Sequence, residues 1–122
     1  MAKSVRTKAL EIPRSVKEAV HKRQKGRSIF APYQMISVEE CCCHFIPRSK
    51  GGLGIEENIF GCSQEQHRLF DNNVLKSPTS KRITNLTIQQ MHSVARNHLI
   101  RSYGSSRNES KLIYKKFKGE EE

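Results

Sequence analysis

Apolar positions recur every three to four residues in three stretches of the chain. The strongest pattern covers 86–102 and is followed by Gly104, and glycine commonly stands just beyond the end of a helix. A second helix is predicted over 15–24, where a Ser-x-x-Glu capping box stands at the start. A third runs from 63 to about 72 and opens with Ser-x-x-Gln. The pattern therefore predicts an early helix, a central helix and a long late helix.

Between the helices predicted at 15–24 and at 63 to about 72, the pattern changes to short apolar runs. Residues 41–46 form one run and 58–60 form another, and the three glycines within 49–54 predict a loop between them. The two runs are therefore predicted to be paired strands. Residues 28–40 are expected to form short extended pieces, and 112–117 either a short helix or an edge strand. The predicted fold class is α+β.

Length and composition suit one small domain. The chain has 122 residues, of which 35% are hydrophobic, which is enough for one domain and too little for two ordinary ones. Residues 13–117 are expected to form that domain, with 1–12 as a flexible basic arm and 118–122 as a disordered acidic tail. No apolar run approaches the roughly 18 residues that a membrane span needs, and no secretory signal is visible. A cytoplasmic protein without membrane contact is expected.

The net charge points to a polyanionic partner. Lys and Arg number 22 and Asp and Glu number 12, which gives +10. Nucleic acid is the commonest polyanion that a small basic domain meets. Ordinary solubility charge and an anionic membrane surface are the alternatives, although the basic residues are spread along the chain and no predicted helix has a Lys/Arg face opposite a strongly apolar one. Charge favours a nucleic acid without selecting a site for it.

The four cysteines have an unusual arrangement, with three in a row at 41–43 and Cys62 apart from them. Neighbouring residues on a strand point to opposite faces, so the triplet does not present three sulfur atoms to one ion without distortion. The absence of any Cys-x-x-Cys pair argues against a thioredoxin-type site and a zinc ribbon. Small buried hydrophobes are the expected role of Cys41 and Cys42, and a redox or metal sensor is an alternative.

Two histidines and one carboxylate carry the candidate chemistry. His44 lies on the first predicted strand, and His67 lies on the central helix with Asp71 four residues later. That spacing puts His67 and Asp71 on one helical face, where an imidazole and a carboxylate can share a divalent cation. A simple hydrogen-bonded pair on a helix surface is the structural alternative.

The ordered set of residues in this region resembles the HNH endonucleases, the ββα-metal nucleases, and most of all the small HNH proteins of bacteria and their phages. The specific part is Cys43-His44-Phe45-Ile46-Pro47-Arg48-Ser49-Lys50-Gly51-Gly52, followed by Asn58, His67 and Asp71. The resemblance implies a small ββα-metal core with an N-terminal helix and a long C-terminal helix. It also implies a metal-dependent enzyme that nicks or cuts DNA, in the cytoplasm of a bacterium or of a phage-infected cell.

The family pattern implies roles for the motif residues. His44 would be the general base that takes a proton from the attacking water, a task that suits a neutral imidazole. Asn58 would brace the loop and so orient that base. His67 would bind one divalent ion, either Mg²⁺, Mn²⁺ or a softer ion such as Zn²⁺ or Ni²⁺, to stabilise charge on the phosphate and the leaving oxygen. The rings of His44 and His67 should then face a common cavity.

Flanking positions extend the implied site. Asp71 falls where many members place another metal ligand, and Cys43 falls where many have His, Asp or Glu as a further one. A thiolate at Cys43 would favour a softer metal, and packing of the thiol in the core is the alternative. Arg48, Lys50 and Arg68 are candidates for holding phosphates, with plain surface charge as the alternative.

The chain differs from the family pattern in lacking the cysteines that bind a structural zinc ion. Many members of this size carry two Cys-x-x-Cys pairs, at places that Ser28 and Ala31, then Ser63 and Gln66, occupy here. No structural zinc is therefore expected, and hydrophobic packing has to hold the motif instead. The candidates for that packing are Phe30, Ile59, Phe60 and Leu69.

Two functions follow from the resemblance and the departure. The first is a metal-dependent HNH endonuclease that hydrolyses DNA. The second is an HNH scaffold that binds DNA or a protein partner with catalysis weak or lost. Retention of His44, Asn58 and His67 favours the enzyme, because a decaying site usually loses its base or its ligand first.

Overall fold

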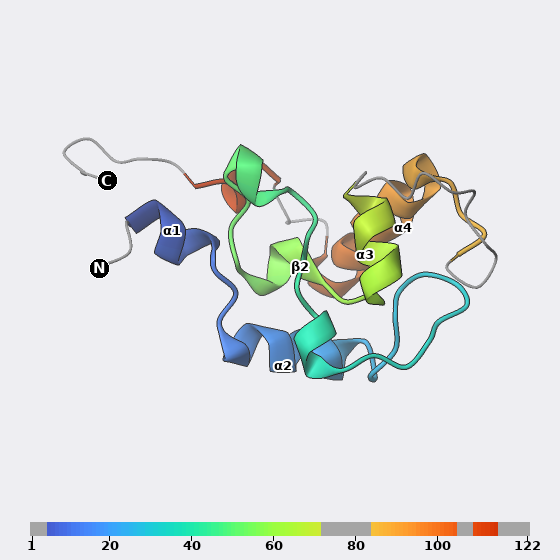
Figure 1. Ribbon diagram of the computed structural model, residues 1–122. Helices are drawn as coiled ribbons and strands as arrows, with labels where there is room; N and C mark the ends of the chain where they lie inside the picture. Colours follow the sequence, from blue (N-terminus) through green and yellow to red (C-terminus); the bar gives the residue numbers. More distant parts are fainter. Residues whose placement is uncertain (1–4, 72–83, 105–108, 115–122) are drawn as a thin grey trace.

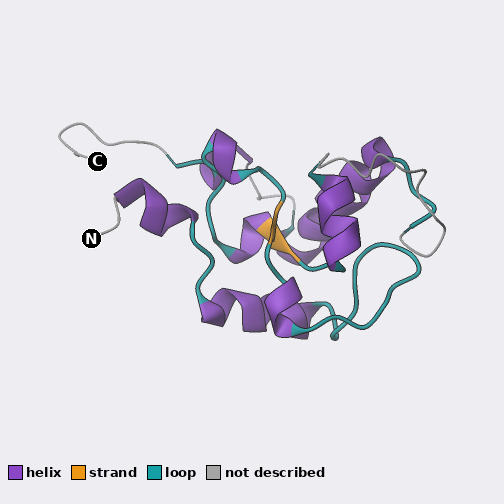
Figure 2. Ribbon diagram, in the orientation of Figure 1, coloured by secondary structure: helices purple, strands orange, loops and turns teal. Residues whose placement is uncertain are grey.

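The computed structural model describes residues 5–71, 84–104 and 109–114, and it confirms the mixed helix and strand architecture (Figure 1). Helices surround one short hairpin (Figure 2). The longer elements are α1 (Val5–Leu10), α2 (Arg14–Arg23), β1 (Cys43–His44), β2 (Ile59–Phe60), α3 (Gln64–Phe70) and α4 (Ile88–Tyr103). Short 3₁₀ segments lie at η1 (Val38–Glu40), η2 (Arg48–Lys50), η3 (Glu56–Asn58) and η4 (Glu109–Leu112).

Helix α1 forms where the sequence predicts a flexible arm. The side chain of Leu10 is only 2% exposed, and the backbone N–H of Gly54 donates to the carbonyl of Ala9 at 3.0 Å. Burying a leucine side chain contributes about 1.5–3 kcal/mol, which offsets part of the entropy cost of ordering the segment. A single buried side chain leaves no periodic pattern in the sequence. The predicted acidic tail, 118–122, lies outside the described residues.

Helix α2 matches its predicted range to within one residue at each end. Its first turn is closed by the carbonyl of Pro13, which accepts from the N–H groups of Val16 (3.0 Å) and Lys17 (3.2 Å), rather than by the predicted capping box. After its last turn, Gly26 takes a left-handed conformation with φ of +73°, which glycine adopts without strain.

Helices α3 and α4 begin with the same device. The side chains of Ser63 and Thr87 each accept a hydrogen bond from the backbone N–H three residues later, and the side-chain oxygen of the glutamine there accepts one from the backbone N–H of the cap residue. Gly104 follows α4 with φ of +79°, as predicted. Within the ranges that the structure describes, no helix has the length and apolarity needed to cross a membrane.

The hairpin is shorter than the apolar runs predict. Strands β1 and β2 pair antiparallel over two residues, with Cys43 opposite Phe60 and His44 opposite Ile59. One more bond, from the N–H of Phe45 to the Asn58 carbonyl (2.8 Å), extends the contact. The glycine-rich loop then begins at a proline, which has no N–H to continue a ladder.

The chain after α4 returns to the glycine-rich loop. The N–H of Leu53 donates to the carbonyl of Leu112 (2.8 Å), and the N–H of Tyr114 donates to that of Gly51 (2.7 Å). Of the stretch 112–117, Leu112 ends η4 and Ile113 forms an isolated bridge to Gly52, while 115–117 lie outside the described residues.

Two apolar clusters form the core. The larger one joins the hairpin, α3 and α4, and its buried members are Phe30, Cys43, Phe45, Phe60, Cys62, Phe70, Met91, Ala95 and Leu99. The smaller one packs α2 against β2, and its buried members are Val20, Ile36, Cys41 and Ile59. On the long helix Met91, Ala95 and Leu99 are fully buried, whereas Ile88 and His98 on the same predicted face are half-buried. Of the four predicted packing residues, Phe30, Ile59 and Phe60 are fully buried and Leu69 is partly buried. The hairpin is held by α2 through one cluster and by α3 and α4 through the other.

The four positions aligned with zinc cysteines meet as a hydrogen-bonded cluster. Ser28 Oγ donates to Gln66 Oε1 (2.5 Å), which also accepts from the N–H of Ser63 (3.2 Å). Gln66 Nε2 donates to the carbonyls of Phe30 (3.3 Å) and Ala31 (3.2 Å). Gln66 is fully buried, and these four bonds use the whole capacity of its amide. Polar contacts therefore add to the hydrophobic packing that the sequence predicts.

Candidate active site

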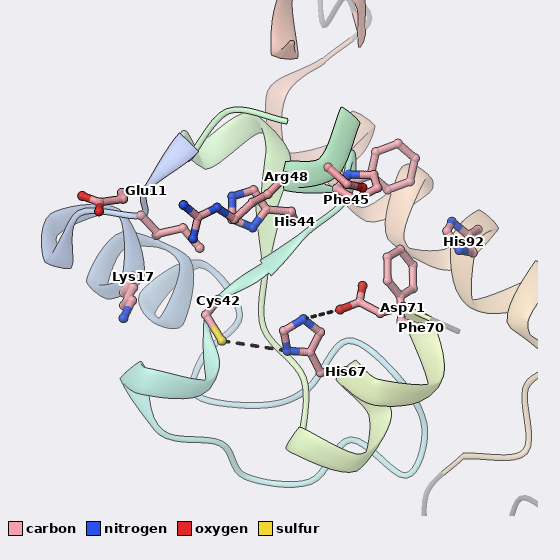
Figure 3. A pocket seen from close by; sticks show the side chains of 13 residues that line it. Glu11, Lys17, Cys42, His44, Phe45, Arg48, His67, Phe70, Asp71 and His92 are labelled. Atoms are coloured by element: carbon pink, nitrogen blue, oxygen red, sulfur yellow. Dashed lines mark hydrogen bonds and ion pairs between the residues drawn. The ribbon is translucent and has the colours of Figure 1, made fainter. Parts of the chain in front are cut away.

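A cavity of about 810 Å³ opens beside β1, with α2 and α3 on its walls (Figure 3). Its titratable lining comes from the segment after α1, from α2, from β1 and the turn after it, and from α3 and α4. Its chief members are Glu11, Cys42, His44, Arg48, His67 and Asp71. His44 and His67 therefore face a common space.

Alternation along β1 decides which cysteine faces the cavity. Cys42 and His44 line it, whereas Cys43 between them is fully buried, with its Sγ 3.1 Å from Cys62 Sγ. Burial raises the pKa of the Cys43 thiol well above its ordinary value, and the contact with Cys62 adds to this. The structure thus places the Cys43 thiol in the core, as the packing alternative has it, and outside the cavity lining. The prediction that Cys42 is a small buried hydrophobe is wrong, because Cys42 is only partly buried and lines the cavity.

His67 and Asp71 form a close pair on α3 and at its end. His67 Nε2 lies 2.9 Å from Asp71 Oδ2, and His67 Nδ1 lies 4.0 Å from Cys42 Sγ (Figure 3). The hydrogen bond with Asp71, reinforced by that with Cys42, raises the pKa of His67 to about 10. The pair is hydrogen-bonded, as the structural alternative predicts, and it also lines the cavity. A cation bound here has to displace the proton that the ring carries at neutral pH.

His44 has one ring nitrogen engaged and one available. His44 Nε2 lies 2.9 Å from the carbonyl oxygen of Leu10. A carbonyl only accepts, so Nε2 carries the hydrogen and the neutral ring keeps its lone pair on Nδ1. Burial lowers the pKa of His44, against the opposing effect of the Leu10 bond, and the charge of Arg48 lowers it further. His44 is therefore neutral at cellular pH, with a basic nitrogen at Nδ1.

Asn58 ties together the two sides of the glycine-rich loop. Its Oδ1 accepts from the N–H of Ile46 (2.9 Å), and its Nδ2 donates to the carbonyls of Ile46 (3.2 Å) and Leu53 (2.9 Å). Its side chain is fully buried, so these bonds are made away from water. They hold the chain just after His44 in one place relative to β2.

The three candidate phosphate-binding residues fall in different places. Arg48 lines the cavity. Lys50, on η2, and Arg68, on α3, are exposed and lie outside the cavity lining. Of these three residues, only Arg48 is therefore placed to contact a phosphate at the cavity itself.

Several lining residues have no signal in the sequence. Glu11 and Lys17 reach the cavity from the segment after α1 and from α2, and His92 reaches it from α4, where its ring stacks on Phe70 with centroids 4.1 Å apart. Cys42 is the exception, because strand alternation alone puts it on the same face as His44.

The pair on α3 suits a divalent cation. It offers one imidazole nitrogen and one carboxylate oxygen close enough to bind the same ion, a donor set that Mg²⁺, Mn²⁺, Zn²⁺ and Ni²⁺ accept. Among residues 5–71, 84–104 and 109–114, no group of three or more His, Cys, Asp or Glu side chains is placed to hold a metal ion. Any ion at this pair would complete its shell with water or with oxygen atoms of a ligand.

Comparisons with protein-family models, with curated proteins and with solved structures find no match to this chain. The fold and the site define the molecule as an α+β domain in which His44 and the His67–Asp71 pair line one cavity. The likeness to HNH endonucleases rests on the motif residues themselves.

Proposed function

We propose that this protein is an HNH endonuclease that uses a divalent metal ion to hydrolyse phosphodiester bonds of DNA. The observation that carries the proposal is the shared cavity, in which neutral His44 and the His67–Asp71 pair face the same space. A base and an adjacent cation-binding pair are the two parts that hydrolysis of a phosphodiester requires. The motif residues support the ββα-metal arrangement of the same site.

His44 acts as the general base. Its Nδ1 takes a proton from a water molecule as the water oxygen forms a bond to phosphorus and the bond to the leaving oxygen breaks. The imidazolium that forms keeps its Nε2–H on the Leu10 carbonyl, so the ring stays oriented throughout. Asn58 holds the loop after His44 in register with β2, and it acts by positioning rather than by touching the substrate.

His67 and Asp71 are the residues that would hold the metal ion, whose role when bound is to stabilise negative charge on the phosphate and on the leaving oxygen. Arg48 and Lys17, at the rim of the same cavity, supply positive charge for neighbouring phosphates. The net charge of +10 supports DNA as the partner, with Lys50 and Arg68 as exposed contacts outside the cavity.

A plasmid assay tests the proposal. The protein is expected to nick supercoiled plasmid in the presence of Mg²⁺, Mn²⁺, Ni²⁺ or Zn²⁺, and EDTA is expected to stop the reaction. The substitution His44→Ala should lower the rate at least ~100-fold, the scale for losing a general base, and leave DNA binding almost unchanged.

The chain offers a matched control for that substitution. His21 is also partly buried and its Nε2 also bonds a backbone carbonyl, that of Ile36 at 3.0 Å, but it does not line the cavity. His21→Ala should therefore leave the cleavage rate close to that of the wild type. If the wild type binds DNA and no ion produces cleavage, the second function, a DNA-binding HNH scaffold, replaces the first.

A further inference from the structure

The segment between α1 and α2 reaches the cavity although it lies far from the motif in the sequence. The Leu10 carbonyl that accepts from His44 Nε2 stands 34 residues before it. Glu11 and Ile12, the next two residues, line the cavity beside His44. The contact with His44 therefore exists only while this N-terminal segment, residues 5–12, is docked on the rest of the domain.

The segment is attached to the rest of the domain at several points of different kinds. The first is the Leu10 side chain, which is 2% exposed. The second is Gly54, whose N–H bonds the Ala9 carbonyl at 3.0 Å. A Cβ at Gly54 would lie 1.8 Å from the Glu11 carbonyl oxygen, so close approach of the two backbones requires glycine there. The side chain of Arg6 adds a bond to the carbonyl of Arg48 at 3.3 Å.

The docked carbonyl selects one of two forms of the His44 ring. A neutral imidazole carries its hydrogen on either nitrogen, and the two forms differ in which nitrogen is basic. The Leu10 carbonyl holds the hydrogen on Nε2 and thereby leaves Nδ1 basic. Without that acceptor the ring is free to turn and to carry the hydrogen on Nδ1, and then Nδ1 takes no proton from water.

We infer that docking of residues 5–12 makes His44 competent as a base, with the Leu10 carbonyl as the positioning group. The catalytic consequence rests on the proposed function, whereas the effect on the form of the His44 ring does not. A merely structural role for the segment would give a different result, because undocking would then lower stability and leave the ring as it is.

The experiment compares variants that undock the segment with one that does not. Leu10→Asp puts a charge at the buried attachment point, and Gly54→Val puts a side chain where the Glu11 backbone lies. Lys8→Ala is the matched control, because that side chain is exposed on the same helix. Proteolysis of the N-terminal segment reports undocking, and ¹⁵N–¹H correlation spectra of the histidine rings report which nitrogen of His44 carries the hydrogen.

The expected result is an Nε2–H ring in the wild type and in Lys8→Ala, and loss of that signature in both undocked variants. In the plasmid assay, kcat should fall on the order of 10- to 100-fold, the scale for losing a group that orients a functional side chain, while KM for DNA stays nearly constant. Amide spectra of α4 check that the rest of the domain remains folded. If either Leu10→Asp or Gly54→Val unfolds the domain, the other variant tests the inference. Gly54→Ala provides a smaller displacement of the same backbone.

Two results overturn the inference. One is an Nδ1–H ring for His44 in the wild type. The other is an undocked segment with the ring signature unchanged. If the wild type cleaves nothing with any ion, the proposed function fails, and the ring spectra alone still decide whether the segment positions His44.

Discussion

Gln66 and His67 are neighbours on α3, yet the polar side chain of the first is buried and fully hydrogen-bonded, whereas that of the second is partly exposed at the cavity. Gln66 is fully buried, and its amide is saturated by the cluster of Ser28, Phe30, Ala31 and Ser63. We call this set the Gln66 cluster. The side chain of His67 is 30% exposed and faces the cavity together with Asp71.

The difference separates stability from chemistry on one short helix. A buried polar group that loses its partner costs about 1–3 kcal/mol, so the Gln66 cluster resists change and offers no atom to a ligand. The His67 side keeps nitrogen and oxygen atoms at the cavity, where a ligand can replace the hydrogen bond between them. One face of α3 therefore stabilises the fold through the Gln66 cluster, and the other face presents His67 to the cavity.

The largest expected effect comes from the functional side. His67→Ala should lower plasmid cleavage on the order of 100-fold or more, because the charge that develops on the phosphate loses its stabilisation. Titration calorimetry with Mn²⁺ should show the loss of binding directly. Urea unfolding near neutral pH should show the loss of the stability that the pair with Asp71 contributes, whereas the fold should persist. Unchanged Mn²⁺ affinity would show that the pair on α3 is not the metal site.

The Gln66 cluster should respond in the opposite way. Gln66→Leu removes four hydrogen bonds from a fully buried amide and leaves their partners unsatisfied, so the free energy of unfolding should fall by about 3 kcal/mol. Urea unfolding measures it, and cleavage per folded molecule should persist at low temperature. Gln64→Ala, at an exposed position of the same helix, is the control and should shift stability by less than about 0.5 kcal/mol. Equal shifts for the two variants would contradict a stabilising role for the cluster.

Two histidines should make stability depend on pH in opposite directions. Burial, with the charges of Arg23 and Arg101, lowers the pKa of His98 to about 4, below the ordinary value of 6.5. The unfolded chain then binds the extra proton between these values, so stability falls as the pH drops from about 6.5 towards 4. The pKa of His67 is raised to about 10, so its contribution is complete below about 6.5 and is lost as the pH rises through 10.

Urea titrations of variants across the pH range separate these two contributions. His98→Gln should flatten the acid side of the stability profile, and His67→Gln should flatten the alkaline side. If His98→Gln flattened the alkaline side instead, and His67→Gln the acid side, the assigned directions of the two pKa shifts would be wrong.

The smallest expected effect comes from replacing Cys43, which points into the core, and Cys42, which points to the cavity. Cys43→Ala should lower the free energy of unfolding by roughly 1 kcal/mol, because it opens a small space in the core, and should leave metal binding unchanged. Cys42→Ala should leave stability almost unchanged, because its side chain lies at the cavity. A thiol reagent should react with Cys42 in the folded protein and spare Cys43. The reverse order of reactivity would contradict the observed alternation.

The sequence predicts the local parts of this molecule well. Helices α3 and α4 fall within two residues of their predicted ends, since the Ser63 cap and Gly104 act on neighbouring backbone. Predicted pairing within 41–46 and 58–60 occurs, but only two residues of each strand join the ladder. The prediction of a flexible arm at 1–12 differs from the structure at α1, where one buried leucine orders a segment whose own sequence has no helical periodicity.

For the site, the spacing of His67 and Asp71 already implies their contact, because helix geometry puts residues four apart on one face. The burial of Cys43, the bond from His44 to Leu10 and the saturation of Gln66 by Ser28 are visible only in the folded chain. The last two join residues 34 and 38 apart, respectively. Such contacts depend on how the whole chain packs, and local periodicity carries no information about them.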